Sequence, residues 1–256
     1  MKKYLIITLL SLAGITGAKA QEYKINKNNG KMVINLSSVT VEGYSGDQII
    51  FKSQRSEADM DPRAKGLRAI NGSGYVDNTG LGISVEEKGS TIEVNQVASA
   101  DLAVKILVPK NVILSIQCHK IPNAGTIICK NLENEIEIST DYNSIKLENV
   151  SGPATVRALY GAVDAVFSEH IKGPISIASI YSLVDVTIPQ DTKANVKLNS
   201  SHGEILASSE LKIEMEKRND DDMITYGGNV NGKLNGGGID FKLISEYGKI
   251  YLRKAK

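Results

Sequence analysis

The chain has 256 residues, of which 41% are apolar, 23% charged and 5% aromatic, with no Trp, 2 Cys and a formal charge of +1. Such a composition is that of a globular chain with ample apolar residues for a core, and it excludes disorder and collagen. The near-neutral charge excludes a nucleic-acid-binding protein of the basic-patch kind. Two cysteines exclude a disulfide-stapled scaffold and a four-ligand zinc module.

Residues 1–20 have the pattern of a secretory signal peptide. Two lysines follow Met1, the apolar run from Tyr4 to about Ile15 is too short to span a bilayer, and Ala18-Lys19-Ala20 supplies the small residues that signal peptidase reads. We therefore expect cleavage before Gln21, with a retained membrane anchor as the alternative. Cleavage removes three of the 30 basic residues and none of the 29 acidic ones, which leaves a charge of about −2. The expected location is the periplasm or the cell surface, with no transmembrane segment left.

The next hundred residues predict short strands without a fixed period. Alternating apolar residues are typical of strands with one buried face, and they occur at 32–36, 39–41, 49–51, 82–85, 91–94, 102–108 and 112–116. A polar stretch, residues 53–80, interrupts them. A loop of this length is uncommon unless it is functional or disordered. We interpret residues 21–120 as the irregular N-terminal part of a β domain.

Residues 121–254 repeat with a period of 18 to 24 residues. An aromatic residue or His, followed in most copies by a small residue, recurs at Tyr142, Tyr160, Tyr181, His202, Tyr226 and Tyr247. Alternating apolar residues flank every one of these positions except Tyr226, which predicts two short strands around a fixed turn. Such a fixed period is the signature of a solenoid, and we expect the six rings to form a structural ladder along one corner.

The coil length decides how the strands pair. About 20 residues cannot hold a βαβ crossover, so each strand must pair in parallel with its counterpart in the next coil. The expected fold class is all-β: a single elongated parallel β-solenoid, a right-handed β-helix by the usual crossover preference. One domain, residues 21–256, would contain both the irregular part and the regular coils.

The two cysteines, Cys118 and Cys129, both continue an apolar alternation and should point inward. The simplest interpretation is two small buried hydrophobic residues. A disulfide between neighbouring coils is the alternative in an oxidising compartment. No His is placed in the sequence to activate either thiol for catalysis.

Acidic residues come closest to a catalytic or metal site. Glu57, Asp59 and Asp61 alternate as calcium ligands do, but Pro62 replaces the required Gly and Arg68 stands where a bidentate acid is needed. We interpret the run Asp220-Asp221-Asp222 as a solvated charge cluster. The sequence therefore predicts no metal site and no cofactor.

Asp164 and Asp185 each follow a ladder residue by four positions, so they should stack on adjacent coils roughly 5 Å apart. Paired carboxylates at such spacing are used by retaining glycosidases. Lys146 starts the same column, however, so a mixed-charge outer face explains it equally well. The lack of Trp also argues against a groove that stacks on sugars. We predict no catalytic residue and keep a polysaccharide-acting β-helix enzyme as an alternative.

Three stretches resemble the adhesin-like β-strand-repeat family, a domain of unknown function in exported bacterial proteins. They are the coil that begins at Gly152-Pro153, the segment Gly232–Gly238 with Tyr247–Lys254, and Arg63–Leu67 with Asp77–Gly82. The similarity covers nearly all of residues 25–254. It implies a β-solenoid and an adhesin-like role, and the family has no established catalytic residues to carry over.

These observations favour an exported, non-catalytic β-solenoid scaffold with adhesin-like binding at the cell envelope or surface. Its partner would be an unidentified envelope or extracellular protein or glycan. A purely structural envelope protein is the alternative. We place the contact surface in loop 53–80, where a flexible surface loop is the competing interpretation, and expect it to use Arg55, Arg63, Lys65, Arg68 and Tyr75.

Overall fold

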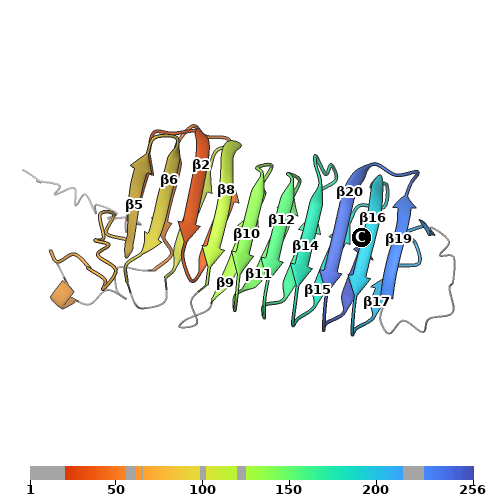
Figure 1. The fold of residues 1–256 in the computed structure, drawn as a ribbon. Coiled ribbons are helices and arrows are strands. Elements are labelled where there is room, and N and C mark those ends of the chain that lie inside the picture. Colours follow the sequence, from red (N-terminus) through yellow and green to blue (C-terminus); the bar gives the residue numbers. More distant parts are fainter. Residues whose placement is uncertain (1–20, 56–61, 65, 99–101, 120–124, 216–227) are drawn as a thin grey trace, which may run out of the picture.

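The protein is a two-sheet all-β structure, seen in a computed structural model that describes residues 21–55, 62–64, 66–98, 102–119, 125–215 and 228–256 (Figure 1). Ten strands form one sheet and eleven form the other, and a single hydrophobic cluster runs from Ile25 to Leu252. The described part contains no α-helix, only the 3-10 turn η2 (Pro62–Ala64). The all-β fold class is confirmed, with two mixed and mostly parallel sheets.

The ten-stranded sheet has the spatial order β1 (Glu22–Ile25), β4 (Ile49–Ser53), β7 (Val104–Val108), β3 (Val39–Gly43), β9 (Thr126–Lys130), β11 (Ser144–Val150), β13 (Val163–Phe167), β15 (Val184–Ile188), β21 (Ile250–Lys254) and β17 (Ile205–Ala207). The eleven-stranded sheet has the order β18 (Ile213–Met215), β19 (Gly228–Leu234), β16 (Ala194–Ser200), β20 (Ile239–Ser245), β14 (Ile175–Ser179), β12 (Ala154–Ala158), β10 (Ile136–Thr140), β8 (Asn111–Cys118), β2 (Asn29–Asn35), β6 (Thr91–Gln96) and β5 (Ile83–Lys88).

From β8 to β15 the chain alternates strictly between the two sheets, two strands to a coil. Strand β10 pairs in parallel with β12, aligning Ile138 with Val156, and β12 pairs with β14, aligning Val156 with Ile177. All three side chains are buried, because alternate residues of a strand face the same side. In this region each strand pairs with its counterpart in the next coil.

At both ends the chain departs from that order. Strands β2 and β3 lie between β6 and β8 and between β7 and β9, so the first coil occupies the second position of the stack. Likewise β20 lies between β14 and β16, and β21 between β15 and β17. The expectation that every coil stacks on the next coil in sequence is therefore wrong at both ends. Coils of one shape offer one another the same strand edges, so the repeat does not by itself fix the order of stacking.

Antiparallel strands cover both ends of the eleven-stranded sheet and one end of the ten-stranded sheet, whose other end is the parallel strand β17. Strand β5 pairs with β6, β1 with β4 and β4 with β7 at one end, and β19 pairs with both β16 and β18 at the other. These strands make both sheets mixed. They also cover parallel edges that would otherwise present unpaired N–H and C=O groups.

Candidate binding surface

Five aromatic rings form a continuous ladder at the corner where β10, β12, β14, β20 and β16 end. The centroids of Tyr142 and Tyr160 are 5.0 Å apart, those of Tyr160 and Tyr181 4.9 Å, and those of Tyr181 and Tyr247 5.1 Å. The His202 ring stacks on Tyr247 at 4.6 Å. Tyr247 thus lies between Tyr181 and His202, because its coil is inserted there. Tyr226, which we also placed in the ladder, lies outside the described residues.

Close coil contact at this corner explains the glycine that follows three of the five rings, at positions 161, 203 and 248. A Cβ added to Gly161 would lie 1.8 Å from the carbonyl oxygen of Asn143, and one added to Gly248 would lie 2.3 Å from that of Ser182. No side chain fits at that separation. The Tyr-Gly pairs therefore hold neighbouring coils at the spacing of stacked rings.

The stacking of the rings restricts which ligands the ladder can bind. The four tyrosines are 39% to 55% exposed, but neighbouring rings cover the faces within the stack. A planar ligand or a sugar ring could therefore stack only at an end of the ladder. The exposed ring edges instead present a row of phenol hydroxyl groups, which can donate and accept hydrogen bonds.

The structure describes loop 53–80 in part. Arg55 and Arg68 are exposed, and Tyr75 is half-buried. Arg63 lies in η2 and is exposed. Lys65 lies outside the described residues, as do Glu57, Asp59 and Asp61 of the calcium-like run. The loop thus presents at least three arginines to solvent.

Two polar residues anchor the second half of this loop. Asn71 donates from Nδ2 to the Gln96 carbonyl oxygen at 2.9 Å, and its Oδ1 accepts the backbone N–H groups of Ser73 and Tyr75. Asp77 is only 8% exposed, and its carboxylate accepts three backbone N–H groups between Thr79 and Gly82 at 2.8 to 2.9 Å. The segment around Arg68 and Tyr75 is therefore held against the end of β6.

Sequence reasoning missed three apolar side chains in the same loop. Leu67 is 75% exposed, Ile70 72% and Val76 40%, although apolar residues of this size are usually buried in the core. Arg68 and Tyr75 lie among them in the sequence. Leu67 and Ile70 interrupt an otherwise polar stretch, and that interruption was the available signal. We call Leu67, Arg68, Ile70, Tyr75 and Val76 the loop patch.

The loop patch and the aromatic ladder lie along the same edge of the molecule. Strands β6, β2, β8 and β10 run parallel, Asn71 is bonded to Gln96 at the end of β6, and Tyr142 follows the end of β10. In Figure 1 the loop is the orange segment at the lower left. A partner could therefore contact the patch and the ladder from one side.

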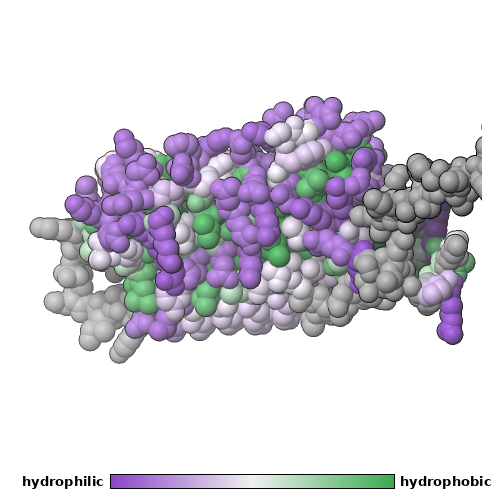
Figure 2. Space-filling model, turned by 180° about the vertical axis from the view of Figure 1, so that it is seen from behind, coloured by the Kyte–Doolittle hydropathy of each residue, from purple (hydrophilic) through white to green (hydrophobic). Residues whose placement is uncertain are grey.

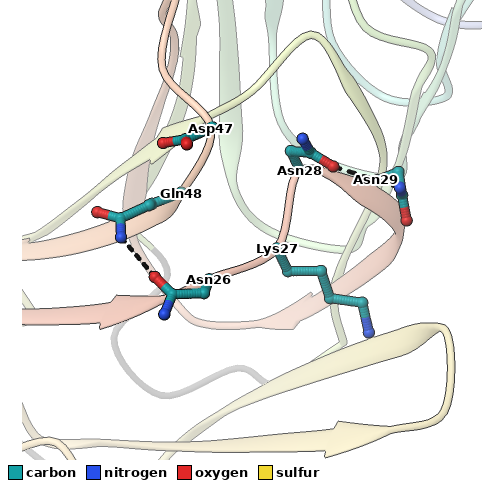
Figure 3. A pocket seen from close by; sticks show the side chains of 6 residues that line it. All are labelled: Asn26, Lys27, Asn28, Asn29, Asp47 and Gln48. Carbon is teal, nitrogen blue, oxygen red and sulfur yellow. Dashed lines mark hydrogen bonds between the residues drawn. The ribbon is translucent and has the colours of Figure 1, made fainter.

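A polar pocket of about 400 Å³ lies at the opposite edge, where β2 begins (Figure 3). Its lining consists entirely of polar side chains: Asn26, Lys27, Asn28, Asn29, Asp47 and Gln48. A hydrogen bond from Gln48 Nε2 to Asn26 Oδ1 joins its two sides, and Lys27 Nζ donates outside the lining to the Gly89 carbonyl oxygen at 2.7 Å. Such a lining suits a hydrated, polyhydroxylated ligand better than an apolar one. Sequence reasoning did not single out these residues, because two separate turns, at 26–29 and 47–48, bring them together.

Both cysteines are buried and free. Cys118 lies in β8 of the eleven-stranded sheet and Cys129 in β9 of the ten-stranded sheet, so they line opposite walls of the core rather than neighbouring strands. The disulfide considered from the sequence is therefore absent from this structure. Burial raises the pKa of the Cys129 thiol to about 12, which keeps it protonated and unreactive near neutral pH.

Asp164 and Asp185 lie side by side in register on β13 and β15. Arg253, however, occupies both oxygens of Asp185: its Nε lies 2.7 Å from Oδ1 and its Nη2 2.8 Å from Oδ2. This bidentate pair neutralises one of the two carboxylates that a glycosidase would need. Among the described residues, no cluster of three or more His, Cys, Asp or Glu side chains could hold a metal ion.

The outer face of the ten-stranded sheet offers no single apolar contact area. Seen from behind, hydrophilic and hydrophobic side chains are interspersed on it (Figure 2). Val166 on β13 is 47% exposed and Leu206 on β17 is 44% exposed, with two strands between them. Isolated apolar side chains of this kind are normal on a protein surface.

No family model and no curated protein sequence matches the chain. The resemblance to the adhesin-like β-strand-repeat family therefore stays a prediction. Two solved structures are similar. A putative cell adhesion protein from Clostridium sporogenes ATCC 15579 is 13% identical, with 93% of this chain and 100% of that chain covered and a TM-score of 0.42. A putative adhesin from Bacteroides fragilis NCTC 9343 is 10% identical, with 93% and 98% covered and a TM-score of 0.27.

The described residues include no helix long and apolar enough to cross a membrane. The predicted signal peptide, residues 1–20, lies outside them.

Proposed function

We propose that the chain is an exported, non-catalytic scaffold that binds a partner at the cell envelope or surface, in an adhesin-like manner. We further propose that its fold is a right-handed parallel β-solenoid with two strands in each coil. The loop patch is the observation that carries it. Large apolar side chains are exposed there beside an arginine and a tyrosine, and this mixture is typical of the centre of protein interfaces.

The anchoring of the patch supports binding over a floppy loop. Asn71 and Asp77 order the backbone on either side of Tyr75 before any partner arrives. A pre-ordered loop loses less conformational entropy on binding than an unordered one. The apolar content of the patch favours a protein partner over a glycan.

A pull-down from envelope fractions, with glycans included, tests the proposal. Leu67→Ser combined with Ile70→Ser should remove the captured partner, because it deletes the two most exposed apolar side chains of the patch. Val166→Ser, which deletes an exposed apolar side chain from the outer face of β13, is the matched control and should keep the partner.

Equal capture by the native chain and the double variant would place the contact elsewhere. Capture of nothing by the native chain would favour the alternative, a purely structural envelope protein. N-terminal sequencing of the protein recovered from outside the cytoplasm should begin at Gln21. Recovery only in the cytoplasm would contradict export.

A further inference from the structure

A single row of side chains crosses the outer face of the eleven-stranded sheet, one residue from each of nine neighbouring strands. Pairing registers align these residues in the order Glu93, Val33, Ser115, Glu137, Thr155, Ser176, Lys242, Lys197 and Asn231. The strands that carry the last five lie side by side at the front of Figure 1. The row is thus acidic toward the N-terminal end of the stack and basic toward the other.

The two halves of this face differ in how their cations are compensated. In the N-terminal half, Lys31 lies 3.6 Å from Glu137 and Lys88 lies 2.6 Å from Glu93, nitrogen to carboxylate oxygen. In the other half, Lys242, Lys197 and Arg157 are exposed and have no carboxylate partner among the described residues. Arg157 follows Thr155 by two residues on β12, so it faces the same side.

Lys242 and Lys197 are direct neighbours in the register of β20 and β16. Adjacent strands lie about 4.8 Å apart, and like charges at that distance destabilise a sheet. Asp240 lies two residues before Lys242 on the same strand, and its Oδ1 accepts a hydrogen bond from Asn195 Nδ2 at 3.4 Å. A bound anion would relieve the repulsion between the two ammonium groups.

The residues around the lysines indicate which anion fits. Thr155, Ser176 and Asn231 stand in the same row and offer hydroxyl and amide groups, which bond to sugar hydroxyls. The row carries no aromatic side chain on which a nucleic-acid base could stack. The strand spacing of about 4.8 Å is close to the length of one sugar residue in an extended chain.

We propose that Lys242, Lys197 and Arg157 bind an extended acidic polysaccharide laid across β12, β14, β20 and β16. The lysines contact carboxylates of successive sugars, Arg157 contacts a third, and the hydroxyl groups of the row contact the sugars between. This site lies on a sheet face, apart from the loop patch. It goes beyond the proposed function and does not depend on it.

Fluorescence anisotropy with a labelled oligogalacturonate, which carries one carboxylate on each sugar, tests the site. At low salt the native chain should bind it, and should bind the neutral methyl ester of the same oligomer far more weakly. Lys242→Gln and Lys197→Gln should each weaken binding about fivefold, the size expected of one exposed charge contact. Lys31→Gln, on the same face but already paired with Glu137, is the matched control and should bind as the native chain does.

Thermal melts separate lost binding from damaged folding. Each of the two lysine variants should melt no lower than the native chain without ligand, because one member of a like-charged pair is gone. The Leu67→Ser/Ile70→Ser variant should bind the oligogalacturonate normally, so failure of the loop patch and failure of this site are distinguishable.

Three results would overturn the proposal. The first is that the native chain does not bind the oligogalacturonate at low salt, and the second is that the lysine variants bind it as tightly as the native chain. Tighter binding of oligothymidylate or of vesicles rich in anionic lipid would replace the polysaccharide by another polyanion.

Discussion

The middle of the molecule and its two ends are built from the same coil but stacked by different rules. From β8 to β15, the coils lie beside one another in the order in which they occur in the sequence. At each end, the first or last regular coil of the chain is inserted one place inward, between two coils that are close in sequence to each other. The periodic sequence therefore determines the shape of a coil, whereas competition among equivalent strand edges determines its neighbours.

At the C-terminal end, the side chains of the inserted coil are more deeply buried than those of the outer coil. Ile250 and Leu252 of the inserted coil are fully buried, whereas Ile205 of the outer coil is half-buried and Ala207 is exposed. The last strong apolar coil thus gains a neighbour on each side. The short strand β17 takes the exposed edge of the ten-stranded sheet, and short edge strands are a common protection against edge-to-edge aggregation.

The variant with the largest expected effect on stability is Phe241→Ala in the inserted coil. Phe241 is 1% exposed, and its ring packs edge-on against Phe167 with centroids 6.1 Å apart. Its loss leaves a cavity between coils on both sides, so we expect the free energy of unfolding to fall by about 3–5 kcal/mol in urea denaturation. Ile205→Ala in the outer coil should cost about 1 kcal/mol or less, since that side chain is half-buried. The opposite ranking would mean that the last coil of the chain is the outer one.

The sequence predicted coils, their inward residues and the ladder corner because these depend on local alternation and on a fixed period. It did not predict their order, because Ile175 aligns equally well with Val196 and with Phe241 in an apolar pattern. The candidate sites are affected in the same way, because their residues come together only once the order of the coils is known. Lys242 stands beside Ser176 only because β20 is inserted next to β14. The two turns that form the polar pocket are likewise separate in the sequence.

The N-terminal insertion is tested by Asn143→Ala. Asn143 is fully buried, and its Nδ2 donates to the Ser37 carbonyl oxygen at 2.6 Å and to the Gly125 carbonyl oxygen at 3.0 Å. Asn143 lies between β10 and β11, so it joins its own coil to the inserted coil of β2 and β3 and to the turn before β9. The loss of these two hydrogen bonds should cost about 1–3 kcal/mol of unfolding free energy, even though the Ser37 carbonyl oxygen keeps the Gly125 backbone N–H as a donor.

Ser182→Ala is the control for Asn143, because Ser182 also follows a ladder tyrosine but shows no side-chain hydrogen bond to another coil. It should change the unfolding free energy by less than about 0.5 kcal/mol. An equally small effect of Asn143→Ala would remove this evidence for the N-terminal insertion.

A smaller effect tests the order of the ladder directly. A double-mutant cycle of Tyr181→Ala and Tyr247→Ala should give a coupling energy of about 0.5–1.5 kcal/mol, because the two rings stack at 5.1 Å. The same cycle with Tyr181→Ala and His202→Ala should be additive, since the Tyr247 ring separates them. Coupling between Tyr181 and His202 instead would restore the stacking order of the sequence.

The smallest effect probes the regular middle through its pH dependence. Glu133 lies between Lys110 Nζ, at 2.7 Å, and Lys172 Nζ, which belong to coils on either side of it. Hydrogen bonds from these two lysines lower the pKa of the Glu133 carboxyl from 4.5 to about 2. A lowered pKa means that the ionised form stabilises the fold above about pH 4.5, and that this stabilisation is lost as the pH falls toward 2.

Because the three side chains are partly exposed, Glu133→Gln should cost at most about 1 kcal/mol at pH 7. In thermal melts the difference between native chain and variant should shrink from pH 5 to pH 2. A difference that stays constant over that range would show that Glu133 does not bridge the coils as an ionised group, and that the middle coils are joined by strand pairing and core packing alone.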